Sequence, residues 1–291
     1  MPELPEVETI ARGLAIRVTG DVIESVWLGS KPEPLKSAAS EIVATLESKR
    51  IAGVRRVGKH IVFDLQNGGR ATSLVRKKSS RQSSKKEQPT TPAVTAQWIV
   101  HLGMTGRMLV CKSDDALEKH THAVARLASG RELRFVDPRR FGRLSVTQGF
   151  AAAGYEPLEV EFDRFVELFR GRKTPIKSAL LNQKLLSGVG NIYADESLFR
   201  AGIRPRRRAA SLTRKELLRL YVAMQEVLKE AISAGGSSIS NYVDADGDEG
   251  FFQLQHRVYG RENEPCLVCK TPIKRIVIGG RSSHYCPKCQ R

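Results

Sequence analysis

The sequence predicts an α+β fold in three parts: an N-terminal β-sandwich or flattened barrel with a leading helix, a helical region, and a C-terminal β-hairpin that carries paired cysteines. Short β-branched runs broken by Gly, Asn and Asp occupy residues 21–148, which is typical of strands. Helical periodicity follows from about residue 159, and two Cys-x2-Cys pairs come last. We place the domain boundaries at 1–150, 151–236 and 237–291.

The leading helix is predicted over residues 5–19. Pro5 suits the first helical position, where its missing N–H would have no partner in any case, and Gly20 suits the C-terminal stop. The apolar residues recur at helical spacing: Val7, Ile10, Ala11, Leu14, Ala15 and Val18. We therefore expect this helix to hold the N-terminus against a packed domain.

Residues 76–97 interrupt the strand pattern with Ser, Lys, Gln, Thr and Pro, a composition typical of an inserted loop. The stretch has six Lys/Arg and one Glu, and without its net +5 the remaining chain keeps +12 of the total +17. That excess favours a polyanionic partner, and nucleic acid over an anionic membrane surface. The insertion is either a solvated loop or an additional nonspecific contact to DNA.

Four segments of the middle region have helical periodicity: 159–170, 174–186, 191–201 and 213–233. Thr213 and Glu216 fit a capping box, and Gly235-Gly236 ends the last of these helices. Gly188-Val189-Gly190 precedes the third, where glycines let the backbone approach an anion and the helix N-terminus offers free N–H groups. Asn191 would then cap this helix or donate to a phosphate. An ordinary turn before a helix explains the glycines equally well.

Two cysteine pairs, Cys266–Cys269 and Cys286–Cys289, are separated by 16 residues. This spacing is typical of a four-cysteine zinc finger on a β-hairpin. Because four thiolates leave no vacant coordination position, we expect one structural Zn²⁺ and no catalysis at the metal. Two disulfides are the alternative, and they fit a cytoplasmic chain poorly.

Gly279-Gly280 predicts the tip of this hairpin and places Arg281 beside it. An arginine on a small rigid finger suits insertion at a phosphate or in a groove, and a solvated turn arginine is the alternative. The fifth cysteine, Cys111, is expected to be a buried apolar residue.

The chain opens with Met1-Pro2-Glu3. Since the side chain of Pro2 is short, we expect Met1 to be removed, which leaves a secondary amine at the N-terminus. An α-amino group titrates near pH ~8, so part of it is neutral at pH 7 and able to attack a carbonyl carbon and form an imine. The alternative is a disordered terminus followed by a proline-started helix.

Together these features closely resemble the formamidopyrimidine-DNA glycosylase family of bacterial base-excision repair enzymes. The matching motifs span the chain apart from the insertion: MPELPEVET at 1–9, GKH at 58–60, HLGMTG at 101–106, KHTH at 119–122, DPRRFG at 137–142, SGVGNIYADESLFRAGI at 187–203 and GGRSSHYCPKCQR at 279–291. The resemblance implies a helix–two-turn–helix domain after the β-sandwich. It also implies excision of oxidised purines, 8-oxoguanine and formamidopyrimidines, followed by β,δ-elimination at the abasic site.

The resemblance also assigns roles to residues. Pro2 is the implied nucleophile toward C1′ of the damaged nucleotide, with Glu3 handling protons. Lys59 and Arg281 are implied in β- and δ-elimination and in phosphate contact. The remaining implied DNA contacts are Met104, Arg139 and Phe141, which would fill the gap left by the everted base, and His120, Arg172, Lys173 and Asn191. Read alone, Met104 and Phe141 could be core residues and Lys59 a solvated strand-edge lysine.

The stretch Ala245–Phe252 corresponds to the loop that covers the everted base in the family. Glu6 corresponds to the surroundings of the active site and ranks below Glu3. The implied partner is damaged double-stranded DNA, bound by a monomer in the bacterial cytoplasm at the nucleoid. No 18 consecutive residues are apolar and no secretory signal is present, so neither a membrane span nor a membrane partner is expected.

Two rival interpretations remain. A non-catalytic DNA-binding protein would explain the charge and the cysteines but not the Pro-Glu terminus. The sister family that prefers oxidised pyrimidines is the nearer rival, and Leu4 with Val7 favours the purine enzyme.

Overall fold

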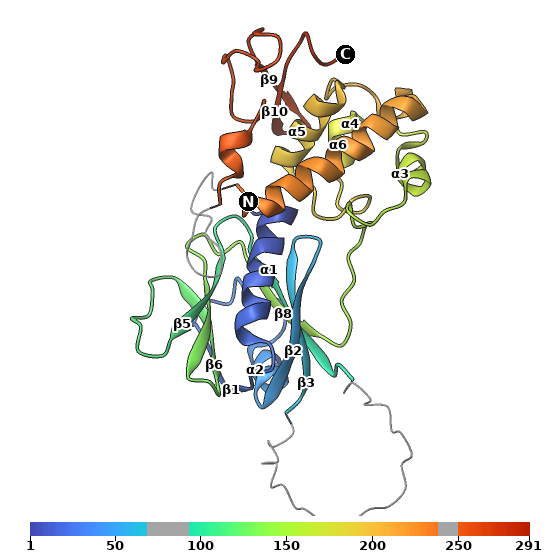
Figure 1. Ribbon diagram of the computed structural model, residues 1–291. Coiled ribbons are helices and arrows are strands. Elements are labelled where there is room, and N and C mark those ends of the chain that lie inside the picture. The colour runs from blue at the N-terminus through green and yellow to red at the C-terminus, as the bar shows by residue number, and fades with distance from the viewer. Residues whose placement is uncertain (69–92, 238–249) are drawn as a thin grey trace, which may run out of the picture.

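The computed structural model describes residues 1–68, 93–237 and 250–291. Figure 1 shows a β-rich body and a helical body, with the N-terminus at their junction. Within the described ranges, no helix is long and apolar enough to cross a membrane. The predicted insertion lies outside these ranges up to residue 92, and Ala96 and Gln97 already belong to a strand. The stretch Ala245–Phe252 lies outside them up to residue 249.

The N-terminal domain is a sandwich of two antiparallel four-stranded sheets, with orders β1-β6-β7-β5 and β2-β3-β4-β8. The first sheet contains β1 (Ile23–Leu28), β6 (Thr121–Leu127), β7 (Arg131–Val136) and β5 (Arg107–Lys112). The second contains β2 (Lys49–Val57), β3 (His60–Asn67), β4 (Ala96–His101) and β8 (Arg143–Thr147). Helix α1 (Leu4–Val18) contributes Val7, Ile10 and Leu14 to the same hydrophobic core as both sheets.

A second helix, α2 (Ala39–Leu46), lies within residues 21–148, where the sequence pattern indicated strands, and this helix was not predicted. Only Ile42 and Leu46 of α2 are buried. Two apolar residues four apart are too short a pattern to show helical periodicity in the sequence. The helix exists because those two side chains fill the sandwich core.

The helical domain contains α3 (Phe162–Phe169), α4 (Ile176–Leu180), α5 (Asn191–Ala201) and α6 (Arg214–Ser233), with a 3₁₀ turn η1 (Ala209–Ser211). The helix predicted over 174–186 is therefore much shorter. It ends because the side chain of Gln183 satisfies backbone groups of a turn, donating to the carbonyls of Leu181 and Val189 and accepting from the N–H of Gly188. The capping box of Thr213 and Glu216 is confirmed.

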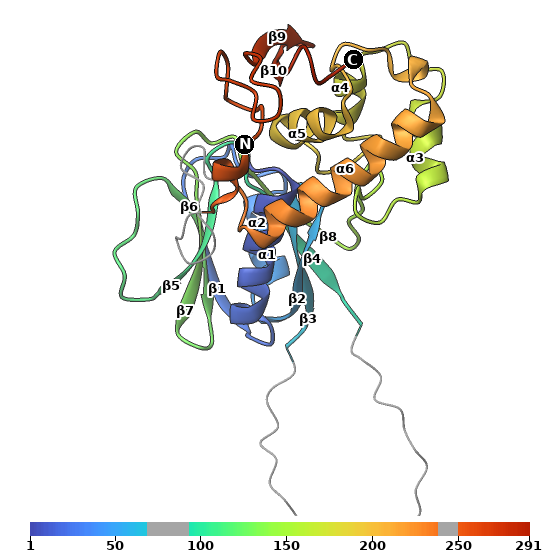
Figure 2. The ribbon, with the colours of Figure 1, turned by 45° about the horizontal axis from the view of Figure 1, so that its top comes forward.

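The C-terminal region begins with a 3₁₀ turn, η2 (Phe252–Gln255), and ends in a hairpin of β9 (Lys274–Ile278) and β10 (Arg281–Tyr285). The finger packs on α5: Phe199 shares a small core with Val258, Ile273 and two of the cysteines, and β10 contacts α5. Figure 2 shows the hairpin above α5.

Candidate active site

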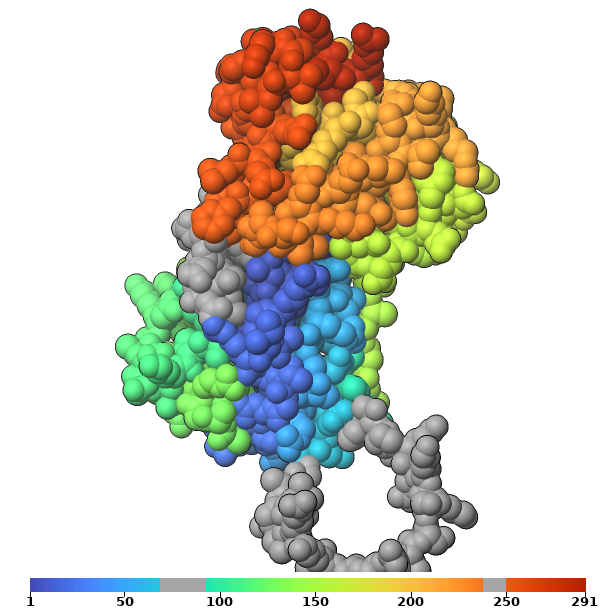
Figure 3. Space-filling model, viewed as in Figure 1, coloured from blue at the N-terminus to red at the C-terminus, as the bar shows by residue number. Residues whose placement is uncertain are grey.

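The N-terminus lies where the two bodies meet. Leu4 belongs to the core of the helical domain, and its N–H donates to the carbonyl of Gly188 at 3.0 Å. Three residues later, Val7 belongs to the core of the sandwich. In Figure 3 the N-terminal helix lies directly against α6, with which it is in contact. The start of α1 is therefore anchored in both bodies, which places residues 1–3 at their junction.

Glu3 is buried at the start of α5. Its Oε1 accepts from the N–H of Ile192 at 3.1 Å and its Oε2 from the N–H of Tyr193 at 3.4 Å. A Cβ on Gly190 would lie 2.1 Å from Cδ of Glu3, so only glycine leaves room for this carboxylate. The expected anion site at this helix N-terminus therefore exists, but a carboxylate of the protein itself occupies it.

Asn191 does not cap α5, contrary to one of the two roles expected for it. It is the first residue of the helix, and Gly190 holds the capping position. Its Nδ2 donates to Oγ of Ser282 on the finger at 3.3 Å. The side chain thus lies at the boundary of α5 and the finger, where the second expected role, donation to a phosphate, would require it to exchange this partner.

Burial raises the pKa of Glu3 from 4.5 to about 7. The nearby charge of Glu6 adds to this rise, whereas Lys59 and the two backbone N–H donors oppose it. Burial also lowers the pKa of Lys59, while the charges of Glu3 and Glu6 oppose that change. A carboxyl group that titrates near neutrality can exchange a proton during a reaction at physiological pH.

Glu6 is the second buried carboxylate of the site. It accepts from the N–H of Glu3 and the N–H of Ser237, both at 2.8 Å, and from the hydroxyl of Tyr193. Burial raises its pKa as well. Glu8 differs, because Arg56 and Arg12 pair with it and its pKa is lowered in spite of a burial effect that opposes the change.

Lys59 reaches this region through the turn between β2 and β3. Gly58 in that turn has a φ of +60°, and a Cβ there would lie 2.0 Å from Oγ of Ser187. The turn therefore packs closely on the segment that precedes α5. Lys59 is buried beside Glu3, and the reading of a solvated strand-edge lysine is wrong.

A cavity of about 340 Å³ opens beside these groups, and Met1, Lys59, Gly190 and Arg281 line it. The further lining residues, which include His60, His101 and Phe150, were not singled out from the sequence as site residues. The rings of His60 and His101 lie 4.9 Å apart, and burial lowers the pKa of His101 to about 4. His60 and His101 could have been found from the sequence, because they belong to the GKH and HLGMTG motifs. No sequence motif pointed to Phe150.

Arg281 is brought to the cavity by a buried ion pair. Nζ of Lys177 lies 2.7 Å from Oδ1 of Asp195 and donates to the carbonyl of Ser282 at 2.6 Å. Asp195 also accepts from the N–H of His284 at 2.8 Å. These contacts hold β10 against α4 and α5. Because Arg281 is the first residue of β10, they also fix its position at the cavity.

A second set of predicted residues is organised by Asp137, which is fully buried. Its carboxylate accepts from the hydroxyl of Thr105 at 2.6 Å, the N–H of Arg139 at 3.2 Å and the N–H of Gly142 at 2.7 Å. The loops that carry Met104 and Phe141 are thereby joined. Both of these side chains are exposed, at 42% and 53%, so the reading as core residues is wrong.

The remaining predicted DNA contacts are exposed. The guanidinium of Arg139 lies 4.8 Å above the ring of Phe141. His120 has a φ of +71°, and its carbonyl accepts from the N–H of Asp137, which places it next to the same loops. Arg172 and Lys173 lie on the turn between α3 and α4 and do not line the cavity.

The four paired cysteines converge within the finger, and their sulfur atoms lie within 4.8 Å of one another. The Sγ atoms of Cys266 and Cys289 are 3.9 Å apart and those of Cys269 and Cys286 are 3.4 Å apart, far from the ~2.05 Å of a disulfide. Four thiolates around one Zn²⁺ at ~2.3 Å would be about 3.8 Å apart. The cluster therefore fits a tetrahedral metal ion, and zinc suits its ligands. Cys111, expected to be buried, is half-buried in β5.

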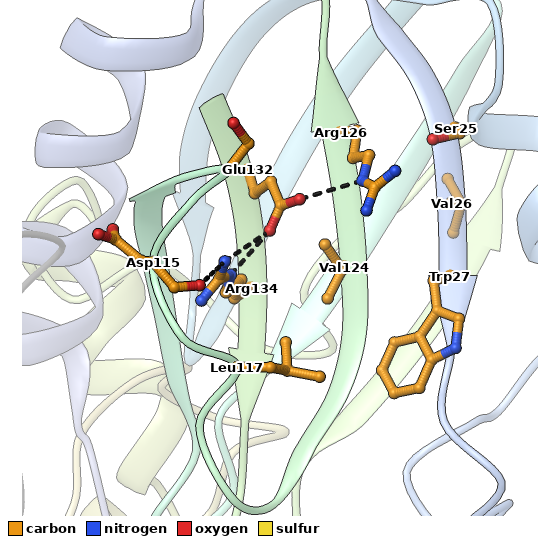
Figure 4. Close-up of a pocket in the computed structure, with 10 residues that line it drawn as sticks. Ser25, Val26, Trp27, Asp115, Leu117, Val124, Arg126, Glu132 and Arg134 are labelled. Carbon is orange, nitrogen blue, oxygen red and sulfur yellow. Dashed lines mark hydrogen bonds and ion pairs between the residues drawn. The ribbon is translucent and has the colours of Figure 1, made fainter. Parts of the chain in front are cut away.

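A larger hollow of about 420 Å³ lies on the outer face of the sheet that contains β1 and β6, with Trp27 and Leu117 among its lining residues (Figure 4). Nε of Arg134 donates to Glu132 at 2.8 Å, and Nη1 of Arg134 donates to the carbonyl of Ala116 at 2.9 Å. Through these two hydrogen bonds, Arg134 connects the loop after β5 to the sheet. None of the predicted catalytic residues lines the hollow, so the site is assigned to the smaller cavity.

The β-sandwich, the helical domain and the four-cysteine finger meet at buried carboxyl and cationic groups, and family matches to all three parts identify the class as a DNA glycosylase. The chain matches the formamidopyrimidine-DNA glycosylase N-terminal domain over residues 1–144, the H2TH domain of that enzyme over 153–243, and the zinc finger found in FPG and IleRS over 263–291. The chain belongs to the formamidopyrimidine-DNA glycosylase family.

Relatives match over the whole length. Formamidopyrimidine-DNA glycosylase of Solibacter usitatus is 42% identical and that of Roseobacter denitrificans 39%, each with 100% of both chains covered. The crystal structure of the Thermus thermophilus MutM (Fpg) protein is 39% identical, with a TM-score of 0.81 over 99% of this chain and 98% of that one. A Lactococcus lactis Fpg mutant in complex with Fapy-dG-containing DNA is 30% identical, with a TM-score of 0.84 over 100% of both chains.

Proposed function

We propose that this protein is a bifunctional DNA glycosylase and abasic-site lyase that excises oxidised purines through a Schiff base with Pro2. One observation carries the proposal. Pro2 adjoins a buried carboxyl group with a pKa of about 7 and follows Met1, which lines a cavity together with Lys59 and Arg281. Removal of Met1, which lines the same cavity, would leave the amine of Pro2 free there.

The proposed reaction begins when the nitrogen of Pro2 attacks C1′ and the base leaves with the electron pair of the glycosidic bond. Glu3 exchanges the protons needed for base loss and for opening of the sugar to the imine. β-Elimination then removes a proton from C2′ and expels the 3′ phosphate, and δ-elimination removes a proton from C4′ and expels the 5′ phosphate. Lys59 and Arg281 are the cations placed to neutralise charge on those phosphates.

The proposal for DNA binding rests on the exposed side chains beside Asp137, which are Met104, Arg139 and Phe141. Base excision requires the damaged nucleotide to leave the stack, at a cost of a few kcal/mol. Met104 and Phe141 are exposed apolar side chains of the kind that unstack base steps, and Arg139 lies against Phe141. We propose that a monomer with one structural Zn²⁺ binds damaged double-stranded DNA in this way. Its affinity should fall steeply with salt, because phosphate contacts release counterions.

Borohydride trapping on duplexes that contain 8-oxoguanine or an abasic site tests the central step. The protein is first shown by mass spectrometry to begin at Pro2, and a preparation that retains Met1 is the matched control. We expect a covalent adduct with the first preparation and none with the second. If protein with a verified Pro2 terminus gives no adduct while it binds the duplex, the non-catalytic DNA-binding alternative is favoured.

Lesion preference needs a separate comparison. One Lactococcus lactis relative, 31% identical with a TM-score of 0.82 over 100% of both chains, was solved with DNA that contains an oxidised pyrimidine. We expect faster excision of 8-oxoguanine than of thymine glycol under single-turnover conditions. The reverse order would assign this chain to the pyrimidine preference.

A further inference from the structure

A buried polar chain leads away from the carboxylates toward the C-terminal region. The N–H of Ser237 donates to Oε1 of Glu6 at 2.8 Å. Oγ of Ser237 lies 3.1 Å from Nε2 of His256 and 3.4 Å from the hydroxyl of Tyr193. Ser237 and His256 are only 4% and 8% exposed, so water competes little for these hydrogen bonds.

The ring of His256 is itself held in place. Phe252 and Tyr259 contact it edge-on, each with ring centroids 5.6 Å away. Phe252 donates its N–H to the carbonyl of Gly236 at 2.9 Å, and Phe251 forms an antiparallel bridge with Ser237. The imidazole therefore packs against the segment Phe251–Phe252, whose backbone pairs with Gly236 and Ser237.

We propose that His256 is a positioning residue for the carboxylate pair Glu3 and Glu6, acting through Ser237. The imidazole fixes the side chain of Ser237, and the backbone N–H of Ser237 then stays aimed at Glu6. Glu6 in turn accepts from the N–H of Glu3, at the residue next to Pro2. The inference rests on the proposed function, since it concerns the groups that exchange protons during base excision.

The titratable groups around Glu6 and His256 determine how a change at His256 should alter the pH dependence of excision. Glu3, Lys59 and Tyr193 surround Glu6, from the N-cap of α1, the turn between β2 and β3, and α5. Among the residues that the structure describes, the titratable side chain in contact with His256 is Tyr259. Burial lowers the pKa of His256 to about 4, so the ring is neutral at pH 7 and contributes a hydrogen bond rather than a charge.

Loss of a hydrogen-bond donor disfavours the ionised form of a carboxylate. If Ser237 is loosened, the doubly ionised state of the Glu3–Glu6 pair becomes less stable, and the upper apparent pKa of the pair rises. The limb of the pH–rate profile that reflects this pair should then move to higher pH, by on the order of one unit.

The test uses His256→Leu, Ser237→Ala, the double variant and His256→Gln, all in the full chain with a verified Pro2 terminus. The glutamine amide can occupy the position of Nε2 and restore the contact with Ser237. We measure single-turnover excision of 8-oxoguanine from pH 5 to pH 9, affinity for a duplex with a stable abasic-site analogue, and thermal stability.

We expect His256→Leu and Ser237→Ala each to slow excision about tenfold and to shift the same limb to higher pH, with affinity changed less than twofold. The double variant should be no slower than either single variant, because both substitutions remove the same hydrogen bond between His256 and Ser237. His256→Gln should restore most of the rate. Multiplicative losses, or lower stability with an unshifted pH profile, would overturn the inference. A wild-type protein that neither excises nor traps would instead overturn the proposed function.

Discussion

The carboxylate of Glu3 accepts a hydrogen bond at 3.1 Å from the backbone N–H of Ile192, a residue 189 positions further along the chain. A helix N-terminus carries free N–H groups and partial positive charge, so it favours the ionised carboxylate. Burial disfavours that form and is the larger effect, which is why the pKa of Glu3 rises to about 7. Proximity to the α5 N-terminus thus sets both the position and the proton affinity of this side chain.

Glu3→Gln should slow base excision by about 10² to 10⁴-fold, the usual contribution of a positioned acid or base. The amide retains the size of the side chain but exchanges no proton. Single-turnover excision of 8-oxoguanine measures the effect, and the exposed Glu41→Gln on α2 is the control, with a rate like that of the wild type. Equal rates for the two variants would remove Glu3 from the chemistry.

The same substitution should change how stability depends on pH. Because the pKa of Glu3 is raised on folding, the native state binds this proton more tightly than the unfolded state. The resulting stabilisation is complete below pH ~4.5 and is lost as the pH rises through about 7, an effect on the order of 3 kcal/mol. The glutamine of Glu3→Gln does not titrate, so the variant does not lose this stabilisation. In urea unfolding, its free energy of unfolding should therefore rise relative to that of the wild type between pH 5 and pH 8. A constant difference would contradict the raised pKa.

Gly190→Ala should destabilise the protein by about 1–3 kcal/mol and impair excision, because its Cβ would lie 2.1 Å from Cδ of Glu3 and push that carboxylate away from α5. Gly149→Ala is the matched control, since no atom lies within 4 Å of the Cβ it would add. Its unfolding free energy should change by no more than about 0.5 kcal/mol. Urea unfolding and excision assays on both proteins check the prediction, and similar behaviour of the two would refute it.

Pro2→Gly should strongly slow base excision, although Met1 is expected to be removed from both proteins and both then begin with an amine. The substitution replaces a secondary, conformationally fixed amine with a primary, flexible one. Excision rates and trapping yields, with each N-terminus verified by mass spectrometry, measure the outcome. Near-normal rates would remove Pro2 as the nucleophile.

Removal of the metal should unfold the finger and weaken DNA binding. Cys266 and Cys286 share a core with Phe199 of α5, so loss of the metal also loosens the packing that holds β10 and Arg281. Chelator titration followed by a duplex-binding assay measures the effect, and Cys269→Ser should reproduce it. Cys111→Ser, in a strand outside the cluster, should bind DNA normally. Unchanged affinity after verified metal loss would count against a structural metal.

Phe141→Ala should weaken binding to abasic-site DNA by about 1–3 kcal/mol, a typical contribution of stacking between an aromatic ring and a base. Because the ring is 53% exposed, the unfolding free energy should stay within about 0.5 kcal/mol of the wild type. Ile16→Ala on α1, where the side chain is 88% exposed, is a control for loss of an exposed apolar group and should bind normally. Equal affinities for the two variants would place Phe141 outside the interface.

The sequence alone determined the order of the parts and much of the chemistry. Local patterns were sufficient for α1, α5, α6 and the finger, because periodicity, capping residues and cysteine spacing act over a few residues. The motifs also identified Glu3, Lys59 and Arg281, which the structure places together. Local patterns were insufficient for α2, which exists because two of its side chains fill the sandwich core. They were also insufficient for the end of α4, where the side chain of Gln183 bonds to backbone groups two to six residues away and a turn replaces the helix.

Only the tertiary structure decided how the parts of the site act on one another. Glu3 belongs to one domain and the α5 N-terminus to the other, so neither the occupant of that anion site nor the raised pKa could follow from spacing along the chain. The exposure of Met104 and Phe141 depends on Asp137, which joins two loops. The contact of His256 with Ser237 likewise arises only on folding. Burial and electrostatic fields depend on distances in three dimensions, and packing of the whole chain sets those distances.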